Sequence, residues 1–103
     1  MNALTFAALA EPNRLSIVEL LRDGPLAVSE IAQRLLLRQP QASKHLQVLK
    51  DAGLVSVKPV AQQRVYELEA GPFVDLNAWV ETYNPTWDNR LDALEDYLAT
   101  LKK

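Results

Sequence analysis

Cysteine is absent from this chain of 103 residues, and histidine occurs once. Without thiols the chain cannot form disulfides, hold metals through thiolates or carry out thiol redox chemistry, and nothing favours an oxidising compartment. Its apolar runs fall well short of the roughly 18 residues of a membrane span. The first segment, "MNALTFAALAEPNR", lacks the basic region of a secretory signal. We therefore expect a cytoplasmic protein with no membrane partner.

Catalytic material is also scarce. Only three glycines occur, Gly24, Gly53 and Gly71, and none belongs to a phosphate-binding loop. His45 has no nucleophile motif near it, and no carboxylate pair adjoins an apolar pocket. We expect a protein that is not an enzyme and uses no cofactor.

Length and composition favour one domain over residues 1–103, with a modest core that a partner chain could enlarge. The net charge of −2 is unevenly distributed. Residues 38–66 contain five basic residues and one acid, a net +4, whereas residues 70–103 contain three basic residues and six acids, a net −3. The basic middle segment is a candidate footprint for a polyanion.

The apolar periodicity predicts a mostly helical fold with one small β-hairpin, an α+β class. A first helix over about residues 3–10 precedes a second that begins near Pro12, carries Leu15, Val18 and Leu21 on one face and stops at Gly24. After a turn at "GPL", Ser29 is expected to cap a third helix, over residues 28–36.

A fourth helix is expected over about residues 39–52, with Pro40 in its first turn and Gly53 after its end. The alternating segments "LVSVKP" and "RVYELE" then predict a hairpin over about residues 54–69. Its connection, "VAQQ", has no Asn-Gly or Asp-Gly signal, so we expect a longer, mobile loop there.

The last segment predicts a helix over about residues 72–101. Apolar or aromatic residues recur at positions 73, 80, 87, 94 and 101. Pro85 indicates a kink or a brief break, and the unchanged phase of the stripe favours the kink. Two tryptophans and two tyrosines on one face exceed the needs of so small a core and suggest a subunit interface.

The helix over residues 39–52 has an unusual polar face. Ala42, Leu46 and Leu49 fall together and form its buried side. The opposite side carries Lys44, Gln47 and Asp51, with Gln41 and Ser43 at its flanks. Amide and hydroxyl groups bond to base edges, and lysine bonds to guanine or phosphate. An ordinary solvated face is the alternative interpretation.

Two short helices around a tight turn form a helix-turn-helix, and the following hairpin makes it a winged one. Residues 39–52 are then the recognition helix, and basic residues on the hairpin can reach the DNA backbone. The candidate DNA-binding residues are Arg38, Gln39, Gln41, Ser43, Lys44, His45, Gln47, Lys58 and Arg64. His45 lies beside the buried stripe and is either a packing residue or a phosphate donor.

The segment "RQPQASKHLQVLKDAGLV", with "LAEPNRLSIVELL" before it and "VYEL" after it, resembles the ArsR-type winged-helix repressors over essentially the whole chain. The resemblance implies a homodimer, assembled by the first and last helices, that represses transcription at an operator of double-stranded DNA with two-fold symmetry. The candidate dimer-interface residues are Leu4, Phe6, Phe73, Leu76, Trp79, Val80, Tyr83, Trp87, Leu91 and Leu94.

The chain departs from this family at two places. Many members have serine where Arg38 stands, so Gln39 or Pro40 must compensate for a missing side-chain cap. The tip of the hairpin carries Gln62 and Gln63 where members often carry arginine, which predicts DNA binding that depends less on the wing.

Metal sensing is not expected. Asp88, Asp92 and Asp96 align along the last helix but have no histidine beside them to complete a zinc site, and a solvated acidic face explains them. Trp79, Tyr83 and Trp87 could line an apolar pocket, but aromatic packing is the favoured interpretation, and no small-molecule effector is identified. A winged helix used only for protein interaction is the rival hypothesis; it predicts that changes at Gln41 and Lys44 are silent.

Overall fold

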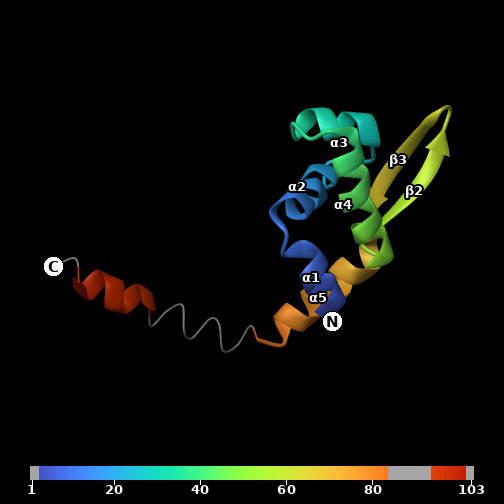
Figure 1. Ribbon diagram of the computed structural model, residues 1–103. Helices are drawn as coiled ribbons and strands as arrows, with labels where there is room; N and C mark the ends of the chain where they lie inside the picture. Colours follow the sequence, from blue (N-terminus) through green and yellow to red (C-terminus); the bar gives the residue numbers. More distant parts are fainter. Residues whose placement is uncertain (1–2, 84–93, 102–103) are drawn as a thin grey trace.

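The computed structural model describes residues 3–83 and 94–101 (Figure 1). Helices and strands follow one another as α1 (Ala3–Leu9), α2 (Pro12–Leu21), β1 (Leu26–Ala27), α3 (Val28–Arg34), α4 (Gln39–Asp51), β2 (Val55–Val60), β3 (Gln63–Leu68) and α5 (Ala70–Glu81). Residues 94–101 are also helical. The mostly helical class with a small antiparallel sheet is thus confirmed.

The core lies where α2, α3 and α4 meet the base of the hairpin. Its largest fully buried side chains are Ile17, Ile31, Leu46, Leu49 and Leu54. The predicted buried stripe of α4 is confirmed, since Ala42, Leu46 and Leu49 are all completely covered. Burying one such aliphatic side chain contributes about 1.5–3 kcal/mol, so this small cluster fixes how the three helices cross.

Helix α2 begins as the sequence predicts but turns a different face to the core. The carboxylate of Glu11 accepts a hydrogen bond from the Arg14 backbone N–H at 2.9 Å, and Pro12 occupies the first turn. Ile17, Val18 and Leu21 are buried, whereas Leu15 is exposed. Placing Leu15 in the stripe was wrong because Ile17, one position before Val18, takes the central place in the core.

Helix α3 begins at Val28, the start expected for residues 28–36, but with a different residue before it as the cap. Residues Leu26–Ala27 form a short strand that pairs with Val65 and Tyr66 of β3, and Ala27, in an extended conformation, is the residue that caps α3. The prediction that Ser29 caps this helix was therefore wrong, and Ser29 lies within the first turn. Helix α3 also ends at Arg34 rather than at residue 36.

Helices α3 and α4 end in the same backbone motif. The N–H of Leu37 donates to the carbonyl of Ala32, and the N–H of Leu54 donates to the carbonyl of Leu49, each at 2.9 Å. This six-to-one bond requires a left-handed residue just before the donor. Gly53 fills that place after α4 with φ 77°, and Leu36 fills it after α3 with φ 56°. Leu36 therefore carries the strain of the turn between the two helices.

The three strands pair antiparallel in the order β1-β3-β2. Val60 pairs with Gln63, so the hairpin closes through Ala61 and Gln62 alone. The expected length of this loop was wrong, because Ala61 adopts φ 55° and supplies the left-handed residue of a two-residue turn without glycine. The hairpin projects beyond α3 and α4 as a narrow wing (Figure 1).

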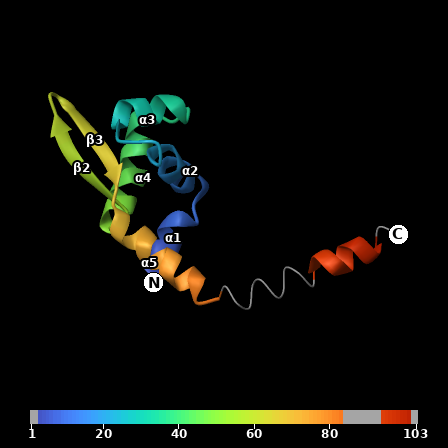
Figure 2. The same cartoon turned by 180° about the vertical axis from the view of Figure 1, so that it is seen from behind.

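Helices α1 and α5 lie side by side, away from the tip of the wing, in both views (Figures 1 and 2). None of the residues of α5 is buried within the protomer. Helix α5 ends at Glu81, and residues 82–83 form a turn, so the helix expected over residues 72–101 does not continue through this point. Pro85 lies outside the described residues. No described helix has the length and apolar character needed to cross a bilayer.

Candidate nucleic-acid interface

The polar face of α4 is open to solvent. Gln41, Ser43, Lys44 and Gln47 are exposed on the side opposite the covered Ala42, Leu46 and Leu49. Because the buried stripe is fixed in the core, the exposed face has a fixed direction relative to the rest of the fold. The helix therefore presents amide, hydroxyl and ammonium groups on a rigid support.

The beginning of α4 is capped by Gln41. Its side-chain oxygen accepts a hydrogen bond from the backbone N–H of Arg38, the residue before the helix, at 3.2 Å. This is one half of a capping box, and it satisfies the backbone N–H of Arg38. As expected, Arg38 makes no side-chain capping bond to the first turn of α4, and the one side-chain bond at this helix start comes from Gln41 instead of Gln39 or Pro40. Since its oxygen is engaged, the amide NH₂ group of Gln41 is what remains for a ligand.

Gln47 is also held by a neighbour on its own helix. Its Nε2 donates to Oδ1 of Asp51 at 2.8 Å, one turn further along α4. This bond orients the amide and leaves the Gln47 carbonyl oxygen as an acceptor facing solvent. Asp51 also places a negative charge at the end of the otherwise basic face.

The two basic residues of the wing lie on opposite faces of the sheet. Alternation along β3 puts Arg64 on the same side as the buried Tyr66, which faces the helices. Lys58 lies on the other side, where its Nζ is 3.1 Å from Oε1 of Glu67. Of the two, only Arg64 is directed toward α4, and it forms no ion pair within the described part of the chain.

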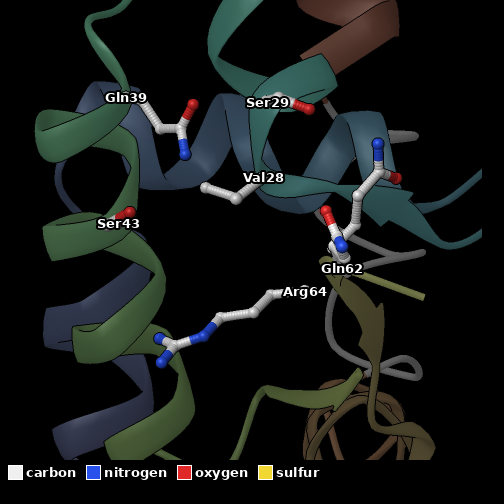
Figure 3. A pocket seen from close by; sticks show the side chains of 7 residues that line it. Val28, Ser29, Gln39, Ser43, Gln62 and Arg64 are labelled. Atoms are coloured by element: carbon white, nitrogen blue, oxygen red, sulfur yellow. The ribbon is translucent and has the colours of Figure 1, made fainter. Parts of the chain in front are cut away.

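A hollow of about 350 Å³ separates the wing from the starts of α3 and α4. It is lined by Val28, Ser29, Gln39, Ser43, Gln62, Gln63 and Arg64. Gln39 enters it from α4 and Arg64 enters it from the strand on the opposite side (Figure 3). None of these lining residues is acidic. The hollow combines one guanidinium with hydroxyl and amide groups.

Ser29, Gln62 and Gln63 were not among the candidate binding residues. Ser29 was assigned to a helix cap, and the glutamines were placed in a mobile loop. The two-residue turn instead brings Gln62 and Gln63 to the rim of the hollow. The alternation of β3, counted from Tyr66, is the sequence signal that could have placed Arg64 over α4.

His45 is half-buried beside the covered stripe of α4, on the side that meets α2, and does not lie on the exposed face. Its Nδ1 lies 3.7 Å from Oε2 of Glu11, the capping residue of α2. Arg14, in the same turn, donates through Nε to the Ala8 carbonyl at 2.7 Å and thereby holds the end of α1. This placement favours the packing interpretation of His45 over a phosphate contact.

The expected dimer residues divide into two groups. Leu4, Phe6, Trp79, Val80 and Tyr83 are exposed, as is Leu94 in the helical segment 94–101. Phe73 packs against the protomer's own core, and Leu76 is half-buried. Trp87 and Leu91 lie outside the described residues.

An aromatic ridge joins α1 to α5. The rings of Phe6 and Trp79 meet edge to face with centroids 5.4 Å apart, and Trp79 meets Tyr83 in the same way at 5.2 Å. Trp79 nevertheless leaves 42% of its surface exposed. We call Phe6, Trp79 and Tyr83 the aromatic ridge.

Within the described residues, no group of three His, Asp or Glu side chains is placed to hold a metal ion.

Comparison with known proteins extends these observations. The helix-turn-helix domain family matches residues 9–58. The transcriptional repressor SdpR of Bacillus subtilis is 30% identical over 86 residues, which are 84% of this chain and 96% of that protein. The regulator Rv2034 of Mycobacterium tuberculosis is 50% identical over 62 residues, 60% of this chain. That match spans 58% of the length of Rv2034, and a match to a second regulator of that organism, NmtR, spans 55%.

Two solved structures share the fold at similar identity. The crystal structure of an ArsR family transcriptional regulator is 30% identical, with a TM-score of 0.71, and the match covers 82% of this chain and 88% of that one. The homodimeric winged helix-turn-helix DNA-binding domain of a Mycobacterium bovis protein is 32% identical, with a TM-score of 0.67, over 81% of this chain and 77% of that one.

Proposed function

Because the chain belongs to the ArsR-type family of winged helix-turn-helix transcriptional regulators, we propose that it is a homodimeric repressor that binds an operator of two-fold symmetry. The operator controls its own or a neighbouring operon, and binding does not respond to a metal ion. Double-stranded DNA and a second copy of the chain are its two partners.

One observation carries this proposal: Gln39 and Ser43 of α4 line the same hollow as the guanidinium of Arg64 from the wing, next to the exposed polar face of α4. Gln41, Lys44 and Gln47 offer groups that pair with base edges. Arg64 comes from the wing, across the hollow from Gln39 and Ser43 of α4, and offers a phosphate contact (Figure 3). A helix in the major groove and a wing against the adjoining backbone would use both at once.

The proposed contacts fall into two classes. Gln41, Ser43, Lys44 and Gln47 contact bases or the phosphates next to them, and Arg38, Gln39 and Arg64 anchor the backbone. Lys58 contributes less than the sequence suggested, because Glu67 neutralises it on the outer face of the wing. His45 acts indirectly by holding α4 against α2.

The aromatic ridge supports the homodimer. Its three residues remain between 42% and 46% exposed although their rings join two helices of one chain. Aromatic side chains arranged in this way are typical of the buried centre of a subunit interface. A two-fold dimer through α1 and α5 would place two copies of α4 in successive major grooves, about 34 Å apart. The homodimeric state of the M. bovis domain agrees with this arrangement.

The donor set argues against metal sensing. Zinc sites in proteins draw on cysteine and histidine. The chain has no cysteine, and its one imidazole, at His45, is directed toward Glu11 inside the fold. The acidic residues of the last segment carry no such ligand beside them.

Hydroxyl-radical footprinting of the chain's own upstream DNA tests the proposal. We expect two protected patches related by two-fold symmetry, with centres about one helical turn apart. A control footprint with Gln41→Ala combined with Lys44→Ala should lose this protection. Protection by wild type at a single unsymmetrical site would contradict the dimeric arrangement. If neither the wild type nor the double variant protects any part of the DNA, the rival role in protein interaction would be favoured.

A further inference from the structure

The hollow between the wing and the two helices has the chemistry of an anion site. Its lining contains one cation, Arg64, and five neutral polar side chains from three elements and the turn of the wing. None of the lining residues is acidic. One guanidinium, with hydroxyl and amide groups on the other walls of the same hollow, suits the oxygen atoms of a phosphate group.

Arg64 is held in this position by the sheet. Two residues further along β3, Tyr66 is buried in the core, and alternation places Arg64 on the same face. Arg64 therefore projects beyond the edge of the core, over the start of α4. Val28 supplies an apolar wall to the hollow, against which an arginine stem can lie. The guanidinium extends across the hollow toward α4 (Figure 3).

Ser43 and Gln39 line the α4 side of the same hollow. They lie four residues apart and thus on one face of the helix. Ser29 adds a hydroxyl from α3. These side chains converge from opposite sides on one space, whereas Lys44 and Gln47 belong to the open part of the α4 face.

We propose that this hollow seats one phosphodiester of the DNA backbone, with Arg64 as its cation and Gln39, Ser43 and Ser29 as neutral donors. This inference rests on the proposed function and refines it, because it assigns Ser43 to the backbone instead of the bases. The seat lies between the α4 face and the wing tip, where a strand passing from one groove to the next would run. We therefore assign the site to a phosphodiester within a DNA strand and not to a free phosphate ion.

The test compares two variants that each remove one positive charge from the wing. Arg64→Gln empties the seat of its cation, and Lys58→Gln removes the charge on the outer face that Glu67 already neutralises. Arg64→Lys keeps the charge but loses the planar guanidinium. Anisotropy titrations use the upstream duplex and a scrambled duplex over a series of potassium chloride concentrations. Circular dichroism melting checks that each variant remains folded.

Arg64→Gln should weaken binding to both duplexes by the same factor, about three- to thirtyfold, and lower the slope of log affinity against log salt by about one. Lys58→Gln should leave the slope nearly unchanged, and Arg64→Lys should restore the slope but not all of the affinity. Three results would contradict the phosphodiester site while leaving DNA binding intact. These are an unchanged salt slope for Arg64→Gln, an effect of Lys58→Gln on affinity equal to that of Arg64→Gln, and a loss of affinity restricted to the upstream duplex.

Two further results separate the remaining cases. Failure of the wild type to bind either duplex would overturn the proposed function and the seat together. Replacing chloride by inorganic phosphate at equal ionic strength should weaken DNA binding by the wild type more than by Arg64→Gln, because free phosphate competes for the same hollow. If Arg64→Gln abolishes binding of inorganic phosphate by the DNA-free protein but leaves the affinity for both duplexes unchanged, the hollow binds a free phosphate, and its assignment to the DNA backbone is overturned.

Discussion

The imidazole Nδ1 of His45 lies 3.7 Å from the carboxylate Oε2 of Glu11, and the two side chains are only 22% and 31% exposed. This contact joins α4, the proposed recognition helix, to the residue that caps α2. Glu11 also accepts the Arg14 backbone N–H, and the Arg14 side chain holds the carbonyls of Ala7 and Ala8 at the end of α1. One acidic side chain thus lies at the point where α1, α2 and α4 meet.

A double-mutant cycle measures the strength of this contact. Glu11→Gln keeps an oxygen to cap α2 but removes the charge that faces His45, and His45→Gln removes the imidazole. Because the pair is partly buried, we expect a coupling free energy of about 0.5–1 kcal/mol in chemical denaturation. Glu19→Gln, at an exposed position of α2, is the matched control and should change stability by less than about 0.5 kcal/mol. Strictly additive effects of the two substitutions would show that the contact contributes nothing.

The turn between α3 and α4 predicts a stabilising substitution. Leu36 is 92% exposed and adopts φ 56°, whereas Gly53 occupies the equivalent position after α4. Leu36→Gly should raise the free energy of unfolding by about 0.5–1 kcal/mol, because relief of the left-handed strain outweighs the added freedom of the unfolded chain. Leu36→Ala keeps a Cβ and should give no such gain. Thermal melts of equal midpoint for the two variants would contradict this account of the strain.

The aromatic ridge predicts the behaviour of the dimer. Trp79→Ala should raise the dimer dissociation constant by at least about tenfold, since a central interface tryptophan typically contributes 2 kcal/mol or more. Helical content should persist, because Trp79 packs on no buried core. Val74→Ala, at an exposed position on the same helix, is the control. Sedimentation equilibrium gives both constants, and a Trp79 variant that dimerises like the wild type would place the interface elsewhere.

Removing the negative charge of Asp51 should increase the affinity of the protein for DNA. Its carboxylate adds a negative charge to the α4 face and binds the amide of Gln47. Asp51→Asn can keep a hydrogen bond to Gln47 while removing the charge, so affinity for any duplex should rise about two- to fivefold at low salt. Asp23→Asn makes the same change in net charge at the turn after α2 and should have little effect. Equal gains from both would mean that only net charge matters.

The sequence predicts the parts of this fold that depend on long periodic patterns. The stripe of Ala42, Leu46 and Leu49 fixes both the buried side of α4 and the direction of its polar face. The alternation in β2 and β3 predicts the wing, and Pro12 and Gly53 mark helix ends. Each of these signals extends over several turns or strand residues, or uses a residue with one favoured backbone geometry.

Very short elements, and features that depend on contacts between distant segments, could not be predicted from the sequence. The strand at Leu26–Ala27 has two residues and exists only because β3 pairs with it, and this pairing moves the start of α3 away from Ser29. Leu36 and Ala61 adopt left-handed conformations that their residue types disfavour, so neither turn could be recognised locally. The hollow at Arg64 combines side chains from α3, α4 and the wing, which no single segment predicts.

We propose that α4 and the wing together bind a specific DNA sequence. A fluorescence-anisotropy titration of the wild-type protein against its own upstream duplex and a scrambled duplex of equal length, at two salt concentrations, tests this most directly. We expect tight binding to the upstream duplex, weaker binding to the scrambled one, and a steep loss of affinity for both at the higher salt concentration. Equal affinity for the two duplexes, or binding to neither, would contradict it.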